Sequence, residues 1–149
     1  MKKVLLLLLC LFTLTGTISA ETYKHTFSSG ELSADGGTAM LSNFEWSYSQ
    51  ATSIGWDDNN GKGIQIGSSK SPNASYSLNS EAFAGCTIKS VTVESSTANG
   101  GDAQLTIAVG NQTSNAYSLT TSNSPYTFDC EVLNQQCTIM FLIVNMNLL

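Results

Sequence analysis

Apolar side chains recur at every second position in several short segments of this chain, and this alternation limits the fold more than any other feature. Successive side chains of a β-strand point to opposite faces of a sheet, so the pattern is typical of strands with one buried face. Apolar spacing of three and four, which a helix would need, is scarce after residue 20. The alternating residues are Phe44, Trp46 and Tyr48; Ile64 and Ile66; Tyr76 and Leu78; Leu105, Ile107 and Val109; Tyr117 and Leu119; and Tyr126 and Phe128.

Turn-forming segments rich in Gly, Asn, Asp, Ser or Pro separate these runs, around residues 34–37, 57–61, 68–73, 98–101 and 122–125. Short strands between such turns predict an all-β fold, an antiparallel β-sandwich of jelly-roll-like architecture. The sequence Asn99-Gly100-Gly101 favours a hairpin between its flanking strands.

One further strand is expected over residues 87–94. In it Val91 and Val93 lie on one side and Ile88 lies on the other, which indicates a bulge or a strand buried on both faces.

The first twenty residues have the layout of a cleaved secretory signal. Lys2 and Lys3 precede an apolar stretch, and small residues lead to Ala20. The apolar stretch is about half of the roughly twenty residues that a membrane-spanning helix needs. We therefore expect a signal peptide over 1–20, a single β-sandwich domain over 21–149, and a mature chain that is secreted or lies in the periplasm or at the cell surface, without a membrane span.

The charge of the chain argues against nucleic-acid binding. The formal net charge is -5, all six basic residues are lysines, and loss of Lys2 and Lys3 with the signal makes the charge -7. Neutralising phosphates requires clustered cations, which this chain lacks. Only 11% of the residues are charged, so much of the surface must be built from uncharged polar side chains.

Three cysteines remain after the signal. Cys130 and Cys137 enclose a short loop and could bridge a hairpin, with Cys86 left free, because an exported chain can form disulfides. The alternative is that all three are small buried apolar residues. His25 lies far upstream and there is no CxxC sequence, which disfavours zinc.

Several motifs resemble a module of secreted and surface proteins from gut Bacteroidetes-type bacteria. They cover much of residues 22–129 and read Lys62-Gly63-Ile64-Gln65-Ile66-Gly67-Ser68-Ser69, Thr87-Ile88-Lys89-Ser90-Val91-Thr92-Val93 and Ala103-Gln104-Leu105-Thr106-Ile107-Ala108-Val109-Gly110. The resemblance implies a jelly-roll-like sandwich that acts as a non-catalytic accessory module, and it carries no catalytic residues.

The end of the chain departs from that module. Ile139 to Val144 are six consecutive apolar residues, which suit a fully buried strand or part of a helix. We expect a C-terminus that is truncated or altered relative to the module, leaving a sheet edge that a partner strand could complete.

Groups for catalysis are few. His25 is the single histidine, there is no GxSxG sequence, and no spacing brings together two of the carboxylates Glu31, Glu45, Glu81 and Glu94. We therefore expect a protein that is not an enzyme, with no required cofactor.

The segment around Trp56 is the best candidate for a ligand site. Trp56 precedes Asp57, Asp58, Asn59 and Asn60, which combine an aromatic ring with carboxylate and amide groups. Three interpretations stay open: a tight turn covered by Trp56, a sugar site using the ring and these polar groups, or a calcium site at Asp57, Asp58 and Asn60.

The expected function is a secreted module that binds a glycan or surface polysaccharide, or mediates adhesion. The alternative is a structural or assembly subunit, or an accessory-domain fragment of a larger secreted protein, that shares a strand with a partner. For Trp46, the alternation predicts a core position, with a ligand platform as the alternative if that face is open.

Overall fold

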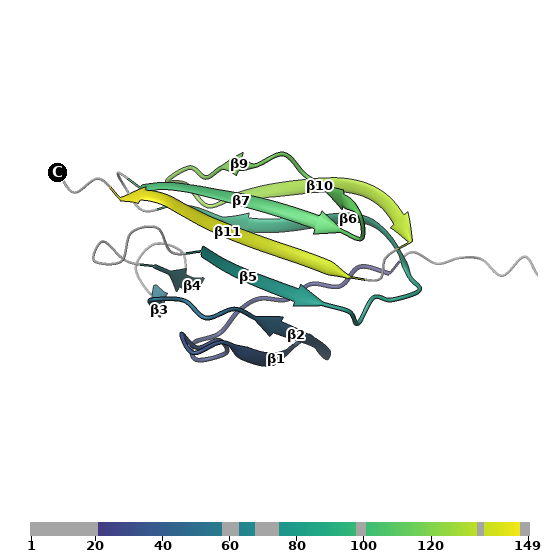
Figure 1. The fold of residues 1–149 in the computed structure, drawn as a ribbon, viewed down its shortest axis with the longest axis horizontal. Helices are drawn as coiled ribbons and strands as arrows, with labels where there is room; N and C mark the ends of the chain where they lie inside the picture. The colour runs from purple at the N-terminus through teal and green to yellow at the C-terminus, as the bar shows by residue number, and fades with distance from the viewer. Residues whose placement is uncertain (1–20, 58–62, 68–74, 98–100, 134–135, 147–149) are drawn as a thin grey trace, which may run out of the picture.

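The computed structural model describes residues 21–57, 63–67, 75–97, 101–133 and 136–146 (Figure 1). These residues contain no helix and form strands that pair antiparallel, so the predicted all-β sandwich is confirmed. The strands are β1 (Gly37–Leu41), β2 (Phe44–Tyr48), β3 (Ile54–Asp57), β4 (Gly63–Ile66), β5 (Ser75–Ser80), β6 (Thr87–Ser95), β7 (Gly101–Val109), β8 (Gln112–Thr113), β9 (Tyr117–Ser118), β10 (Ser124–Leu133) and β11 (Cys137–Met146).

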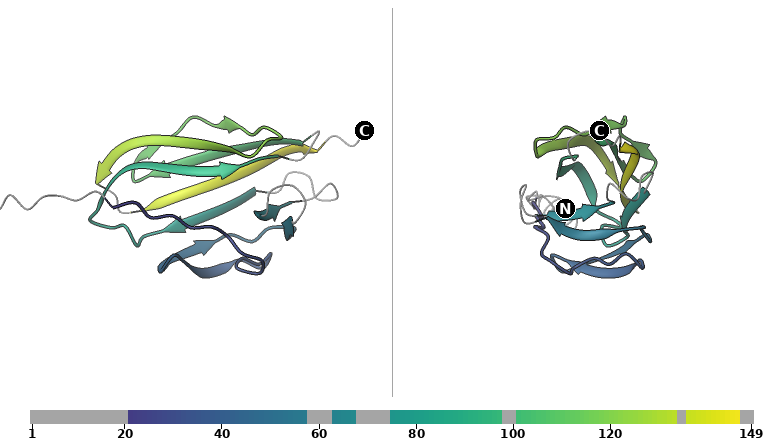
Figure 2. Two further views of the ribbon diagram at one scale, coloured as in Figure 1. Left: turned by 180° about the vertical axis from the view of Figure 1, so that it is seen from behind. Right: turned by 90° about the vertical axis from the view of Figure 1, so that its left-hand side faces the viewer.

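The largest sheet has seven strands in the order β1-β2-β5-β11-β7-β8, with β9 paired to β7. β10 pairs with β6, and β3 pairs with β4, as separate two-stranded sheets. Seen from the end, the strands surround a common interior (Figure 2). The apolar run 139–144 lies within β11, which pairs with β5 on one edge and β7 on the other, so the strand interpretation of that run is correct.

Alternation predicted the buried faces correctly. Leu105, Ile107 and Val109 of β7 have no exposed surface, and Tyr76 and Leu78 of β5 are 1% and 4% exposed. Burial raises the pKa of the Tyr76 phenol above its usual range, mainly through loss of solvation and further through Tyr48, so this side chain stays neutral.

The aromatic row of β2 also behaves as predicted. Trp46 and Tyr48 are half-buried and pack against the cluster that contains Leu41 and Leu78. Trp46 is therefore part of the core, as its alternation predicted.

The predicted hairpin around Asn99-Gly100-Gly101 is wrong. Residues 98–100 lie outside the described residues, but the strands on either side do not pair, since β6 joins β10 and β7 joins β11. Turn-forming residues indicate where a chain changes direction, and they do not specify the sheet that it enters. A five-residue connection can reach up to about 16 Å, enough to pass between layers about 10 Å apart.

The sequence indicated either a bulge in residues 87–94 or burial of that strand on both faces; a bulge is present in the pair of β6 and β10, but its extra residue lies on β10. The pairing register of β10 against β6 shifts between Asp129 and Val132. Asp129 pairs with Ser90 and Val132 pairs with Ile88, so β10 has one more residue than β6 between these two pairs. Glu131 takes a φ of 49° at this point, a left-handed conformation that a non-glycine residue rarely adopts.

Gly36 is required by both conformation and space. Its φ is +78°, and a Cβ there would lie 3.0 Å from the Gln50 nitrogen and 3.2 Å from the Tyr48 carbonyl oxygen. Gly30 has a similar φ of +84°, with no atom within 4 Å of a Cβ. Comparing alanine substitutions at the two glycines therefore separates two contributions to the free energy of unfolding: the strain of a positive φ, and the clash of a Cβ with nearby backbone atoms.

We expect Gly36→Ala to lower the free energy of unfolding clearly more than Gly30→Ala does. Gly30→Ala should cost about 1–2 kcal/mol from its left-handed φ alone, whereas Gly36→Ala adds a clash with backbone atoms. Urea unfolding of both variants measures the difference. Equal losses would contradict a steric role for Gly36.

Candidate functional site

The hairpin of β3 and β4 positions Trp56. Trp56 pairs with Ile64 and Asp57 pairs with Gly63, so the connection 58–62 joins the two strands directly beyond Asp57. Trp56 is half-buried at the second-last position of β3. In the sequence, Trp56 is therefore the second residue before the connection that carries the predicted polar groups.

Those polar groups are not described. Asp58, Asn59 and Asn60 lie outside the described residues, and of Asp57 only the backbone is described. The sugar site and the calcium site at Asp57, Asp58 and Asn60 therefore stay predictions. Within the described ranges, three or more His, Cys, Asp or Glu side chains do not gather in a group that could hold a metal ion.

A second group of polar side chains lies at the N-terminal strap, which we define as residues 21–32. The strap contains no strand, and its side chains hold it against the body of the protein. Tyr23 and Phe44 are in ring contact, Phe27 packs against the core, and Leu32 is only 6% exposed.

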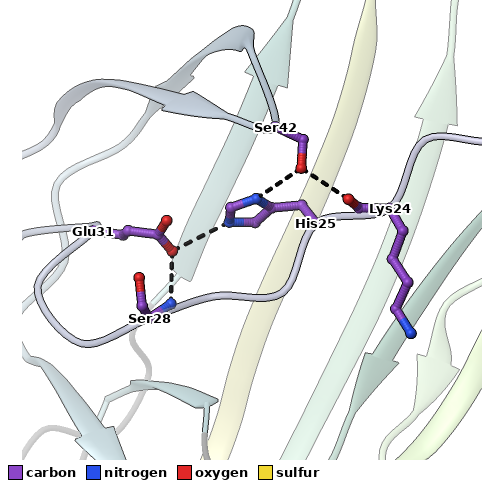
Figure 3. A network of polar contacts seen from close by, with 5 residues as sticks. All are labelled: Lys24, His25, Ser28, Glu31 and Ser42. Atoms are coloured by element: carbon purple, nitrogen blue, oxygen red, sulfur yellow. Dashed lines mark hydrogen bonds and ion pairs between the residues drawn. The ribbon is translucent and has the colours of Figure 1, made fainter.

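His25 is the centre of this polar group (Figure 3). Its Nδ1 lies 3.2 Å from the Ser42 hydroxyl oxygen, and its Nε2 lies 3.2 Å from Glu31 Oε2. The Ser42 hydroxyl donates to the Lys24 carbonyl oxygen at 2.8 Å, and the Ser28 amide donates to the same Glu31 oxygen at 2.7 Å. The network ties the strap to the turn between β1 and β2.

Serine, histidine and glutamate in contact could suggest a nucleophile with its base, but the hydrogen bonds favour a structural tie. The Ser42 hydroxyl donates its proton to the Lys24 carbonyl, which leaves the Ser42 oxygen as an acceptor for His25 Nδ1. An imidazole protonated on both nitrogens can donate to Ser42 and to Glu31 at once. Sequence reasoning considered His25 and Glu31 separately, and it missed Ser42 because the contact spans 17 residues.

Glu31 is held as a carboxylate. Burial, the largest single effect, raises its pKa, but the Ser28 amide and the contact with His25 together outweigh burial and lower the pKa below the ordinary 4.5. A carboxylate whose folded pKa is lowered stabilises the fold above its ordinary pKa and loses that contribution as the pH falls through the lowered value.

An aromatic cluster lies beside this network. The ring of Tyr23 meets Phe44 edge to face with a centroid distance of 4.8 Å, and Phe44 and Phe83 are also 4.8 Å apart. The ring centroids of Trp46 and Phe83 are 6.2 Å apart. Sequence reasoning identified Phe44 and Trp46 and missed Tyr23 and Phe83, although Tyr23, His25 and Phe27 themselves alternate.

Cys130 is a free thiol in the structure, and its sulfur lies 3.4 Å from the Ile88 carbonyl oxygen. Burial raises its pKa, which reduces its reactivity. The thiol lies in a shallow hollow of about 380 Å³ that Lys89, Asp129 and Glu131 also line.

The expected hairpin between Cys130 and Cys137 is wrong, since β10 and β11 belong to different sheets. The structure gives Cys130 as a free thiol and therefore does not show the predicted disulfide, and the side chain of Cys137 is not among those described. Cys86 is an exposed free thiol, so the buried alternative does not apply to it.

No family model, curated protein or solved structure matches this chain. Within its described ranges, the structure has no helix with the length and hydropathy needed to cross a membrane.

We expect Glu31→Gln to flatten the acid limb of the stability curve. The wild type should lose stability as the pH falls below about 4.5, because protonation of Glu31 weakens its bonds to Ser28 and His25. The amide variant keeps an acceptor oxygen and lacks this titration. Urea unfolding at a series of pH values measures the difference. Glu94→Gln on β6 is the control for loss of one negative charge. Identical pH profiles for the wild type and Glu31→Gln would refute the role of Glu31 in the acid limb.

Proposed function

We propose that this protein is a secreted, non-catalytic module that binds a glycan or surface polysaccharide through the tip of the β3–β4 hairpin. The observation that carries the proposal is the position of Trp56. The hairpin holds this indole half-buried, one residue before Asp57 and the polar connection 58–62. A fixed aromatic ring beside carboxylate and amide groups is suited to stacking on a pyranose and bonding its hydroxyls.

The rest of the chain supports the same class of function. The signal-like segment 1–20 favours export, and the low fraction of charged residues suits contact with a neutral polymer. The resemblance to surface-protein modules of gut bacteria agrees with both. The polar groups of the His25 network bond to one another and to the Lys24 carbonyl, and the proposal gives them a structural role.

We expect Trp56→Ala to weaken binding to a glycan array by about tenfold or more, since the stacking surface is lost. Trp56→Phe keeps a flat ring and should retain most of the binding. Circular dichroism of each variant controls for folding.

Repeating the array with EDTA tests the calcium interpretation, which requires binding to fall when calcium is removed. A wild type that binds no glycan would overturn the proposed function. An unchanged Trp56→Ala would exclude this hairpin as the site.

A second candidate function is strand sharing in an assembly. In the described part of the chain, β6 pairs with β10 on one edge and has no strand on the other. A nine-residue edge without a neighbouring strand in the described residues can accept a strand from another chain.

Strand sharing predicts that the protein associates as its concentration rises. Light scattering after size exclusion should show a mass above that of the monomer, in the presence of a reductant that prevents disulfides through the exposed Cys86. A monomer at every concentration would contradict self-association through this edge.

A further inference from the structure

Tyr23 is unusual among the exposed side chains of the described residues. Three large apolar side chains are exposed there: Tyr23 at 56%, Met40 at 62% and Leu133 at 67%. Tyr23 is the aromatic one, and it remains exposed while contacting two other rings. A single exposed apolar residue needs no explanation, whereas Tyr23 keeps more than half of its surface exposed while two other rings limit how its ring can move.

Two kinds of contact hold the ring of Tyr23 in place: contacts with other aromatic rings, and hydrogen bonds made by the residues that follow it in the chain. The Phe44 ring meets the Tyr23 ring edge to face, with an interplanar angle of 89°. The centroid of the Phe83 ring lies 6.3 Å from that of Tyr23, with an interplanar angle of 54°. The next residue, Lys24, has its carbonyl bound by Ser42, and His25 is bound on both ring nitrogens. The His25 network therefore reduces the entropy that a ligand would lose by ordering this segment.

A carboxylate flanks the ring. The Tyr23 hydroxyl donates a hydrogen bond to Glu21 Oε2, and this bond is the main cause that raises the phenol pKa, so Tyr23 stays neutral. Glu21 is exposed, and a carboxylate has acceptor positions left after one bond. An open aromatic ring beside an accepting carboxylate matches the apolar face and the hydroxyl groups of a neutral sugar.

We infer that Tyr23, backed by Phe44 and Phe83 and flanked by Glu21, is a second contact site for a neutral pyranose ring of a glycan. The ligand class, a glycan, rests on the proposed function, whereas the site itself rests on the contacts of Tyr23 with Phe44, Phe83 and Glu21. Figures 1 and 2 show the β3–β4 hairpin near the start of β5, and the connection 81–86, to which Phe83 belongs, beyond the end of β5 at the opposite side of the molecule. The two sites are therefore separate, and one long glycan could contact both.

The test measures binding of neutral hexasaccharides of glucose, xylose and mannose by NMR titration of the wild type and of single variants. Tyr23→Ala and Tyr23→Leu should each weaken binding by about tenfold, because neither side chain has a flat ring face. Tyr23→Leu keeps apolar packing against Phe44, which guards against loss of folding. Tyr23→Phe should retain binding within about threefold, since the ring remains.

Met40→Ala and Leu133→Ala are matched controls, because both positions are at least as exposed as Tyr23 and carry no ring. Both should bind as the wild type does. Binding that falls in Trp56→Ala and is unchanged in Tyr23→Ala and Tyr23→Leu would overturn this inference and leave the proposed function standing. Binding that falls only in the Tyr23 variants would support this site and exclude the hairpin, and no binding by the wild type would overturn both.

Discussion

Complete burial of one face of β7 is the constraint on which the rest of the structure depends. Leu105, Ile107 and Val109 have no exposed surface, and burial of each such side chain is worth about 1.5–3 kcal/mol. A strand can bury alternate residues this fully only when another layer covers that face. The antiparallel pairing of β11 with both β7 and β5 then joins the two halves of the large sheet.

The N-terminal strap completes this core without joining a sheet. Leu32 and Phe27 pack into the cluster around Tyr76 and Leu78, while the His25 network fixes the strap to the turn of the β1–β2 hairpin. Side-chain packing and hydrogen bonds that involve side chains thus bring residues 21–32 against strands that follow later in the chain. The same contacts hold Tyr23 over Phe44 and so create the exposed aromatic surface.

Sequence reasoning succeeded where the signal was local. Alternation predicted the inward faces of β2, β5 and β7. The change of phase at Ile88 indicated a bulge or a strand buried on both faces, and the structure has a bulge on the partner strand β10. Sequence reasoning failed at the connections after β6 and β10, because each strand pairs with a partner distant in sequence. The contacts of Tyr23 with Phe83 and of His25 with Ser42 were missed for the same reason, since nothing in the spacing of residues marks a contact between distant segments.

The sequence by itself determined that this protein is built from strands and which side chains they bury, because side-chain direction along a strand follows a period of two. Only the tertiary structure decided which strands pair, where the strap lies, and that Tyr23 remains exposed beside Glu21. The physical reason is that burial depends on what covers a side chain, and in this fold the covering residues come from distant parts of the chain.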